Sequence, residues 1–359
     1  SRYSHTLSAG WLAFASIVFY GYWDYHYIPL LLSSICFNFW MGLKIAFSAK
    51  PFRKSWLVFA ITSNLLLLAY FKYADFFIST VNYINNADVE TLGIILPIGI
   101  SFYTFTQIAF LVDTYEGKVK EYRFIHYLLF VTYFPHLIAG PVLHHKEMMP
   151  QFADLRIYRF SQSDFAVGIT IFCIGLAKKV LIADNLAPFA NNLFNETSSS
   201  PSLLIAWGGV LAYTFQLYFD FSAYSDMAIG LSRLFGVNLP LNFNSPYKSS
   251  NISEFWRRWH MTLSRFLRDY LYIPLGGNRV GLFKQYRNLM VVMLLGGLWH
   301  GAGWSFVIWG GLHGIYLIIH HGWAKLSQKI QFPVTAMLWQ IMATGLTFIS
   351  VCIAWVFFR

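Results

Sequence analysis

Leu289-Met-Val-Val-Met-Leu-Leu-Gly-Gly-Leu-Trp-His300 is an apolar run that ends in a histidine and continues into Gly301-Ala-Gly-Trp304. An ionisable side chain in such a run is costly in a bilayer, and function is the default explanation for it. A second histidine ends the basic and aromatic stretch Glu254-Phe-Trp-Arg-Arg-Trp-His260. The two histidines are therefore the first candidates for a functional site.

The composition is that of a membrane protein. Of the 359 residues, 57% are hydrophobic, 19% aromatic and only 12% charged, and the mean hydropathy is +0.49. These values lie outside the range of soluble domains. The net charge of +10 is expected to reflect basic cytoplasmic loops facing anionic lipid. No exposed basic run indicates binding to nucleic acid.

Apolar runs recur along the chain, and most are near the length that crosses a hydrocarbon core of roughly 30 Å. Period-two alternation is absent, so the sequence predicts an all-α, polytopic transmembrane helical bundle with about 9–11 membrane segments. Ala223–Phe235 and Leu289–His300 are expected to be short or re-entrant. The predicted spans are Leu7–Trp23, Tyr27–Phe47, Ser55–Phe71, Leu92–Val112, Ile125–Leu143, Phe165–Ile182, Ser202–Ser222, Leu289–Trp299, Gly303–His320 and Thr335–Phe358.

The distribution of basic residues predicts the topology. The loop around Lys50, Arg53 and Lys54 and the stretch Lys248–Arg287 are both basic, so we expect them on the cytoplasmic side. Lys72–Glu90 is acidic and is expected outside. The sides of the loops between positions 142 and 165 stay open.

Positions 252–272 show the spacing of one amphipathic helix at the membrane interface. Asn251 and Glu254 form a plausible N-cap pair, and Pro274 ends the pattern. His260 lies at the edge of the apolar face and can point into the protein. The apolar face comprises Ile252, Phe255, Trp256, Trp259, Leu263, Phe266, Leu267 and Tyr270, whereas Arg257, Arg258, Met261, Arg265, Arg268 and Asp269 mostly occupy the other face.

Each candidate residue has a functional and a structural interpretation. A desolvated, neutral imidazole at His300 can accept a proton from a hydroxyl, or the ring is simply packed and hydrogen-bonded. His260 is catalytic, orients a donor or anchors its helix. The arginines of the basic stretch hold the phosphates of a nucleotide-like donor, or they meet lipid headgroups. The predicted donor-binding residues are Arg257, Arg258, Arg265 and Trp299, the tryptophan beside His300.

Two carboxylates, Asp220 and Asp226, follow an apolar run and are predicted to orient a histidine, to pair with the arginines, or only to form a polar cluster at a helix end. His144-His145 and His320-His321 are expected to be interfacial pairs. No set of residues has the spacing of a metal site. The three cysteines lie in apolar runs, so a disulfide framework is not expected.

Several motifs, taken in order, resemble the membrane-bound O-acyltransferase (MBOAT) family, in particular its bacterial branch with the alginate O-acetyltransferase membrane subunit. These motifs cover most of positions 92–319. They are Leu96-Pro-Ile-Gly-Ile-Ser-Phe-Tyr-Thr-Phe105, Val112-Asp-Thr-Tyr115, Leu137-Ile-Ala-Gly-Pro141, Phe219-Asp-Phe-Ser-Ala-Tyr-Ser-Asp-Met-Ala-Ile-Gly230, Phe255-Trp-Arg-Arg-Trp-His-Met261, Asp269–Arg279 and Leu298-Trp-His-Gly301.

The resemblance implies O-acylation across a bacterial inner membrane. A cytoplasmic thioester donor, acetyl-CoA, with no tightly bound cofactor, would meet a hydroxyl of a polysaccharide such as alginate, cellulose or peptidoglycan. A periplasmic partner protein would complete the transfer. The essential histidine of the family maps onto His300 and its second histidine onto His260. His136 and His144-His145 depart from the pattern and put the acceptor contacts there in doubt.

The resemblance also implies that residues 1–359 form a single membrane-embedded domain that is truncated at both ends. Two alternatives stay open. The first is transfer of D-alanine to teichoic acid by a related enzyme. The second is a transporter whose histidines form a proton path.

Overall fold

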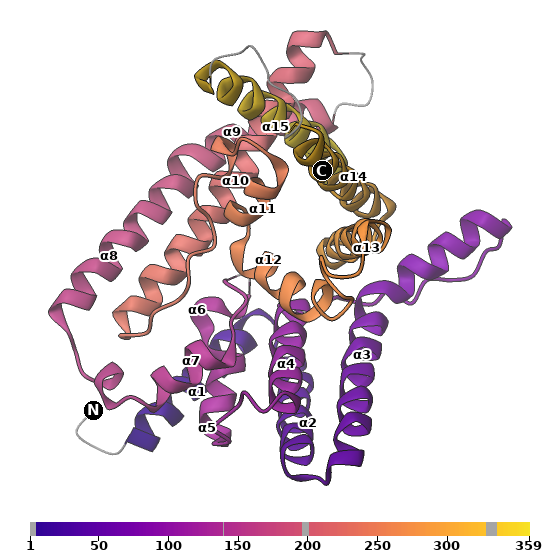
Figure 1. Ribbon diagram of the computed structural model, residues 1–359. Helices are drawn as coiled ribbons and strands as arrows, with labels where there is room; N and C mark the ends of the chain where they lie inside the picture. Colours follow the sequence, from indigo (N-terminus) through magenta and orange to yellow (C-terminus); the bar gives the residue numbers. More distant parts are fainter. Residues whose placement is uncertain (1–4, 139, 196–200, 328–335) are drawn as a thin grey trace. The chain divides into compact units, whose positions relative to one another are not determined.

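The computed structural model describes residues 5–138, 140–195, 201–327 and 336–359, and within these ranges it contains helices and no strand (Figure 1). The prediction of an all-α protein is confirmed. Thr335, the predicted start of the last span, lies outside the described residues, as does Ala139 in one of the motifs. Among the described residues, four helical segments are long and apolar enough to cross a membrane: Tyr25–Phe47, Lys50–Asn85, Gln162–Asn195 and Met337–Phe358.

The chain divides into two compact units. The first comprises residues 1–172 and 228–240, and the second comprises residues 173–227 and 241–359. The division falls inside two helices, α8 (Gln162–Ala177) and α10 (Leu203–Leu234), so the chain passes between the units within continuous helix. Each unit has its own hydrophobic core.

The first unit begins with a group of helices in mutual contact. α2, α3 and α4 touch one another pairwise, and Asn38 of α2 and Asn64 of α3 join them by a reciprocal amide pair with N···O distances of 3.0 and 2.6 Å. Such polar pairs link helices whose surroundings are apolar. The elements are α1 (His5–Trp23), η1 (Tyr25–Tyr27), α2 (Ile28–Phe47), α3 (Lys50–Asn85) and α4 (Ile100–Tyr115).

Two predicted spans of this unit are wrong in their bounds. The span Leu92–Val112 becomes helical only at Ile100, because Pro97 lacks an N–H and Gly99 has φ 71°. The span predicted at positions 125–143 is broken after α5, since Pro135 cannot donate the next helical hydrogen bond. The elements that follow are α5 (Phe124–Thr132), α6 (Phe134–Leu137), α7 (His145–Ala153) and η2 (Leu155–Tyr158).

The second unit holds both candidate histidines. Ala223–Phe235 is not a separate short segment, because α10 runs continuously from Leu203 to Leu234, and the segment Leu289–His300 is the end of the longer helix α13, which starts at Leu282. The elements of this unit, besides parts of α8 and α10, are the π-helical turn η3 (Lys178–Ala183), α9 (Asp184–Asn195), η4 (Pro246–Lys248), α11 (Ile252–Arg258), α12 (Met261–Leu267), the π-helical turn η5 (Arg268–Tyr272), α13 (Leu282–His300), α14 (Trp304–Ser327) and α15 (Ala336–Phe358).

Glycines bring α13 and α14 close together beside His300. A Cβ at Gly297 would collide with the backbone of Phe306, and one at Gly310 would collide with the backbone of Met293. The two helices therefore pack backbone to backbone, as small residues permit. Gly297, three residues before His300, thus permits the close approach of a neighbouring helix.

Candidate functional site

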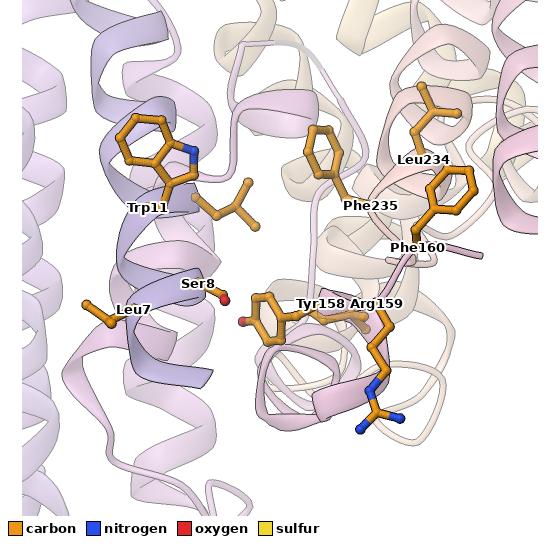
Figure 2. A pocket seen from close by; sticks show the side chains of 10 residues that line it. Leu7, Ser8, Trp11, Tyr158, Arg159, Phe160, Leu234 and Phe235 are labelled. Carbon is orange, nitrogen blue, oxygen red and sulfur yellow. The ribbon is translucent and has the colours of Figure 1, made fainter. Parts of the chain in front are cut away.

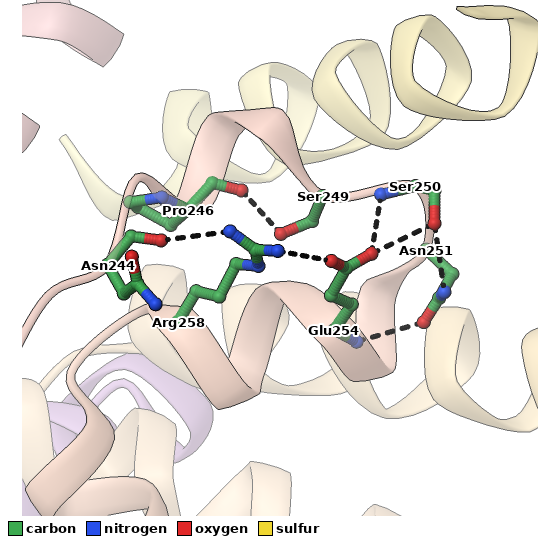
Figure 3. A network of polar contacts seen from close by, with 7 residues as sticks. All are labelled: Asn244, Pro246, Ser249, Ser250, Asn251, Glu254 and Arg258. Carbon is green, nitrogen blue, oxygen red and sulfur yellow. Dashed lines mark hydrogen bonds and ion pairs between the residues drawn. The ribbon is translucent and has the colours of Figure 1, made fainter. Parts of the chain in front are cut away.

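The site is built on α11, whose first turn is held by a polar network (Figure 3). Asn251 Oδ1 accepts a hydrogen bond from the Glu254 N–H at 2.9 Å, as the predicted N-cap requires. The carboxylate of Glu254 accepts from the N–H and hydroxyl of Ser250, both at 2.9 Å, in place of the predicted return bond to Asn251. Arg258 pairs with Glu254 at 2.7 Å. This network fixes the helix that leads to His260.

His260 interrupts the helix predicted over positions 252–272. Its φ of 41° lies in the left-handed region, so α11 ends before it and α12 begins after it. The prediction of one continuous helix is wrong because a distant segment competes for the backbone. The Asn242 carbonyl accepts from the Met261 N–H at 2.9 Å, and the Asn244 N–H donates to the Arg258 carbonyl at 2.9 Å. Strained backbone of this kind persists only where its surroundings hold it.

The side chain of Asn242 fixes the tautomer of His260. Asn242 Oδ1 accepts from the Thr262 N–H at 3.3 Å and from its hydroxyl at 2.9 Å. Because the backbone N–H can only donate, the amide oxygen must face this group. His260 Nδ1, 3.1 Å from the same oxygen, must then carry a proton and donate. The lone pair of the neutral ring therefore lies on Nε2.

Burial keeps His260 neutral. The residue has no exposed surface, and desolvation lowers the pKa of its imidazole to about 3. Its Nε2 is buried and has no hydrogen-bond partner among the described residues. A neutral imidazole with an unused lone pair can accept a proton or a hydrogen bond from a substrate.

The fold brings the two histidines together. The ring centroids of His260 and His300 lie 6.4 Å apart. Trp299 contacts both rings, with centroid distances of 5.9 Å to His260 and 4.9 Å to His300. Its side chain is buried, whereas His300 at the end of α13 is half-buried. The sequence could not show this proximity, because forty positions separate the histidines.

Aromatic side chains from several helices surround the pair. Phe221 of α10 packs edge-on against His260 at 4.8 Å, and Trp309 and Phe358 each lie 5.1 Å from His300. Behind Trp309, at 4.8 Å, lies a third histidine, His313, whose ring is fully buried. Sequence reasoning missed His313, although its place in an apolar helix was the same signal that drew attention to His300.

The predicted donor-binding arginines do not share one helical face, because the break at His260 separates them. Arg257 is exposed at the end of α11, whereas Arg258 is engaged with Glu254. Arg265 is half-buried in α12. Arg268 pairs with the neighbouring Asp269 at 2.7 Å. Arg257 is thus the arginine of α11 that is most open to a ligand.

The carboxylates predicted to support a histidine have other partners. Asp226 lies 2.5 Å from Lys178, and Asp220 lies 2.7 Å from Lys179, which also pairs with Asp184. Both aspartates lie within α10 and not at its end, so the prediction of a helix-end cluster is wrong. Among the described residues, both aspartates form ion pairs with the lysines of the π-helical turn η3, and not with a histidine or an arginine.

The histidine pair at positions 144 and 145 is buried within the protein. His145 Nδ1 lies 3.0 Å from the buried carboxylate of Asp113, the acidic residue of the Val112–Tyr115 motif. No group of three or more potential metal ligands occurs among the described residues. The ion pair of His145 and Asp113 in the first unit therefore links α7 to α4.

The geometry thus describes an apolar membrane protein with two adjoining histidines, one of them held in a neutral form. Comparison with known sequences defines the class: the membrane-bound O-acyltransferase family matches residues 100–359. The chain belongs to this family, as its motifs predicted.

Three similar proteins show which members of the family this chain resembles. The peptidoglycan O-acetyltransferase of Helicobacter pylori is 48% identical over 97% of this chain and 70% of the relative. The probable alginate O-acetylase AlgI of Azotobacter vinelandii is 44% identical over 100% of this chain and 70% of the relative. The teichoic acid D-alanyltransferase of Bacillus subtilis is 29% identical over 73% of this chain and 68% of the relative. The chain spans about 70% of the length of the first two.

Proposed function

We propose that this protein is a membrane O-acetyltransferase that moves an acetyl group from a cytoplasmic thioester, acetyl-CoA, to hydroxyls of an extracytoplasmic polysaccharide. Family membership supports acyl transfer, and the names of the two most similar relatives reported above support an acetyl group and a polysaccharide acceptor. The bacterial cytoplasmic membrane is the proposed location, with a periplasmic partner that completes the transfer.

The observation that supports this mechanism is the distance of 6.4 Å between the ring centroids of His260 and His300, which lie in the same unit. His300 is proposed as the general base. It removes the proton of the acceptor hydroxyl while the oxygen attacks the thioester carbonyl, and the proton then passes to the departing thiolate. His260 positions the donor through Nε2 or shares the proton transfer. Arg257 and Arg258 are proposed to bind the donor phosphates, with Arg265 and Trp299 lining the donor path.

The test is acetyl transfer from labelled acetyl-CoA by the purified protein. General-base catalysis contributes about 10²–10⁴-fold in rate, so His300→Ala should abolish detectable transfer while the protein still inserts and purifies. His26→Ala, an exposed histidine change in the first unit, is the matched control and should keep full activity. Transfer by His300→Ala at the wild-type rate would contradict the assignment and make His260 the leading candidate.

The same assay separates the alternative within the family. Similarity to D-alanyltransferases is weaker but extends over 73% of the chain. If a D-alanyl thioester on a carrier protein is used and acetyl-CoA is not, the donor assignment is wrong and the fold assignment stands. Membership of an acyltransferase family favours group transfer over the transporter alternative, for which proton flux without any acylated product is the expected result.

A further inference from the structure

A cavity of about 420 Å³ lies wholly within the first unit, whereas both candidate catalytic histidines lie in the second. Its wall is formed by the start of α1, the segment after η2 and the end of α10 (Figure 2). The lining residues are Leu7, Ser8, Trp11, Leu12, Ile157, Tyr158, Arg159, Phe160, Leu234 and Phe235. No step of the proposed acyl transfer uses this cavity.

The wall of the cavity is apolar and open to the outside. Trp11 is 70% exposed and Phe160 is 76% exposed. Figure 2 shows the rings of Trp11, Phe160 and Phe235 around the cavity, with the guanidinium of Arg159 at the lower edge of the view. A hydrocarbon chain fits such a wall, because it neither donates nor accepts hydrogen bonds.

The start of a candidate membrane span lies beside this cavity. The helical segment Gln162–Asn195 is long and apolar enough to cross a membrane, and it begins two residues after Phe160 of the cavity wall. Helices that cross a bilayer begin and end in the interfacial layer, where amphipathic rings such as tryptophan gather. A ligand here can reach into the hydrocarbon from one side and keep a polar end among the headgroups.

Arg159 supplies a cation at this level. Its side chain is exposed and has no carboxylate partner among the described residues. The neighbouring arginines differ from it, because Arg156 pairs with Asp154 at 2.6 Å and Arg233 pairs with Asp164 at 2.8 Å. An arginine whose charge is not already neutralised is suited to bind a phosphate through its fork of N–H donors.

We propose that this cavity is a binding site for an anionic phospholipid of the surrounding membrane. One acyl chain lies against Trp11, Leu12 and Leu234, and the phosphate binds the guanidinium of Arg159. The site is independent of the acyl-transfer proposal, because it uses residues of the other unit and needs no reaction.

Native mass spectrometry of the detergent-purified protein tests the site, with dioleoyl phosphatidylglycerol and dioleoyl phosphatidylcholine as probes. A charge-assisted bond corresponds to about ten-fold or more in affinity. Phosphatidylcholine carries the same phosphate, but its quaternary ammonium neutralises the headgroup and opposes Arg159, so the wild-type protein should retain phosphatidylglycerol better than phosphatidylcholine. Arg159→Gln should remove that preference, whereas Arg156→Gln, three residues away and already paired with Asp154, should keep it.

Chain length separates a lipid site from a site for a free phosphate. Dihexanoyl phosphatidylglycerol should bind more weakly than the dioleoyl form, and Leu234→Trp, which fills the cavity, should weaken the dioleoyl form most. Equal retention of the two headgroups, or an equal effect of Arg159→Gln and Arg156→Gln, would overturn the proposal. Equal binding by glycerophosphate without any chain would also overturn it. The chain-length comparison uses the unmodified protein, so it decides the question even if Leu234→Trp does not fold.

Discussion

Asn242 should control the chemistry at His260 although it is remote in sequence from both histidines. Its side-chain oxygen accepts from His260 Nδ1 at 3.1 Å and from two groups of Thr262. In Asn242→Leu the imidazole keeps its burial but loses the acceptor that fixes its tautomer. Both tautomers then become populated, and the lone pair no longer stays on Nε2.

The size of the effect follows from the groups that lose a partner. A buried donor that loses its acceptor costs about 1–3 kcal/mol, and three donors, His260 Nδ1–H and the N–H and hydroxyl of Thr262, face the lost oxygen. We expect the free energy of unfolding to fall by about 2–4 kcal/mol after partial relaxation. The rate should fall by about 10–10²-fold, less than the 10²–10⁴-fold of a missing general base.

The assay is acetyl transfer at varied acetyl-CoA concentration, with Asn244→Leu as the control. Asn244 lies two residues away and is exposed, so its change should leave kcat intact. Asn242→Asp provides a second test. A carboxylate beside the imidazole favours the protonated ring, so activity should be lost more at pH 6 than at pH 8. If Asn242→Leu lowers only stability and leaves kcat and the pH profile unchanged, the tautomer argument is refuted.

Three further results are expected. Burial lowers the pKa of His260 to about 3, so between pH 6.5 and that value only the unfolded chain gains a proton at this residue. The free energy of unfolding should therefore fall as the pH drops from 6.5, by about 2 kcal/mol at pH 5. In thermal unfolding, His260→Asn should make this decline less steep. Arg257→Ala should weaken acetyl-CoA binding by about ten-fold or more without loss of stability, whereas Arg258→Ala should also lower the melting temperature because it breaks the pair with Glu254. His145→Leu removes the imidazole that lies 3.0 Å from the buried Asp113 carboxylate and should cost about 1–3 kcal/mol in chemical denaturation; an unchanged midpoint would contradict this.

The class of protein and the family could be predicted from the sequence, and His260 and His300 could be named from it as candidates. Hydrophobic content and apolar runs are properties of composition, so they need no tertiary contact to be recognised. The N-cap at Asn251 is likewise a local signal, and its bond to the Glu254 N–H is present. His300 stood out because an imidazole in an apolar run is costly unless it is used.

The local sequence pattern predicted the wrong helix bounds where contacts with a distant segment, or a proline, determine the backbone conformation. The spacing over positions 252–272 fits one helix, yet hydrogen bonds from Asn242 and Asn244 hold His260 in the left-handed region. The break at Pro135 could have been foreseen from its missing N–H. The role of Asn242 could not, because it depends on a bond between residues eighteen positions apart.

By itself, the sequence determined that this is a helical membrane acyltransferase, and it named the histidines to be tested. Hydrophobicity and family motifs are properties of the local sequence, so they can be recognised without knowledge of tertiary contacts. The tertiary structure decided which partners these residues have. It placed the ring centroids of His260 and His300 6.4 Å apart. It paired Asp226 with Lys178 and not with a histidine, and it brought Asn242 to the position where it fixes the tautomer of His260. These outcomes depend on how the helices pack. Packing brings together side chains that are far apart in the sequence, and their positions in the sequence do not show that they will be in contact.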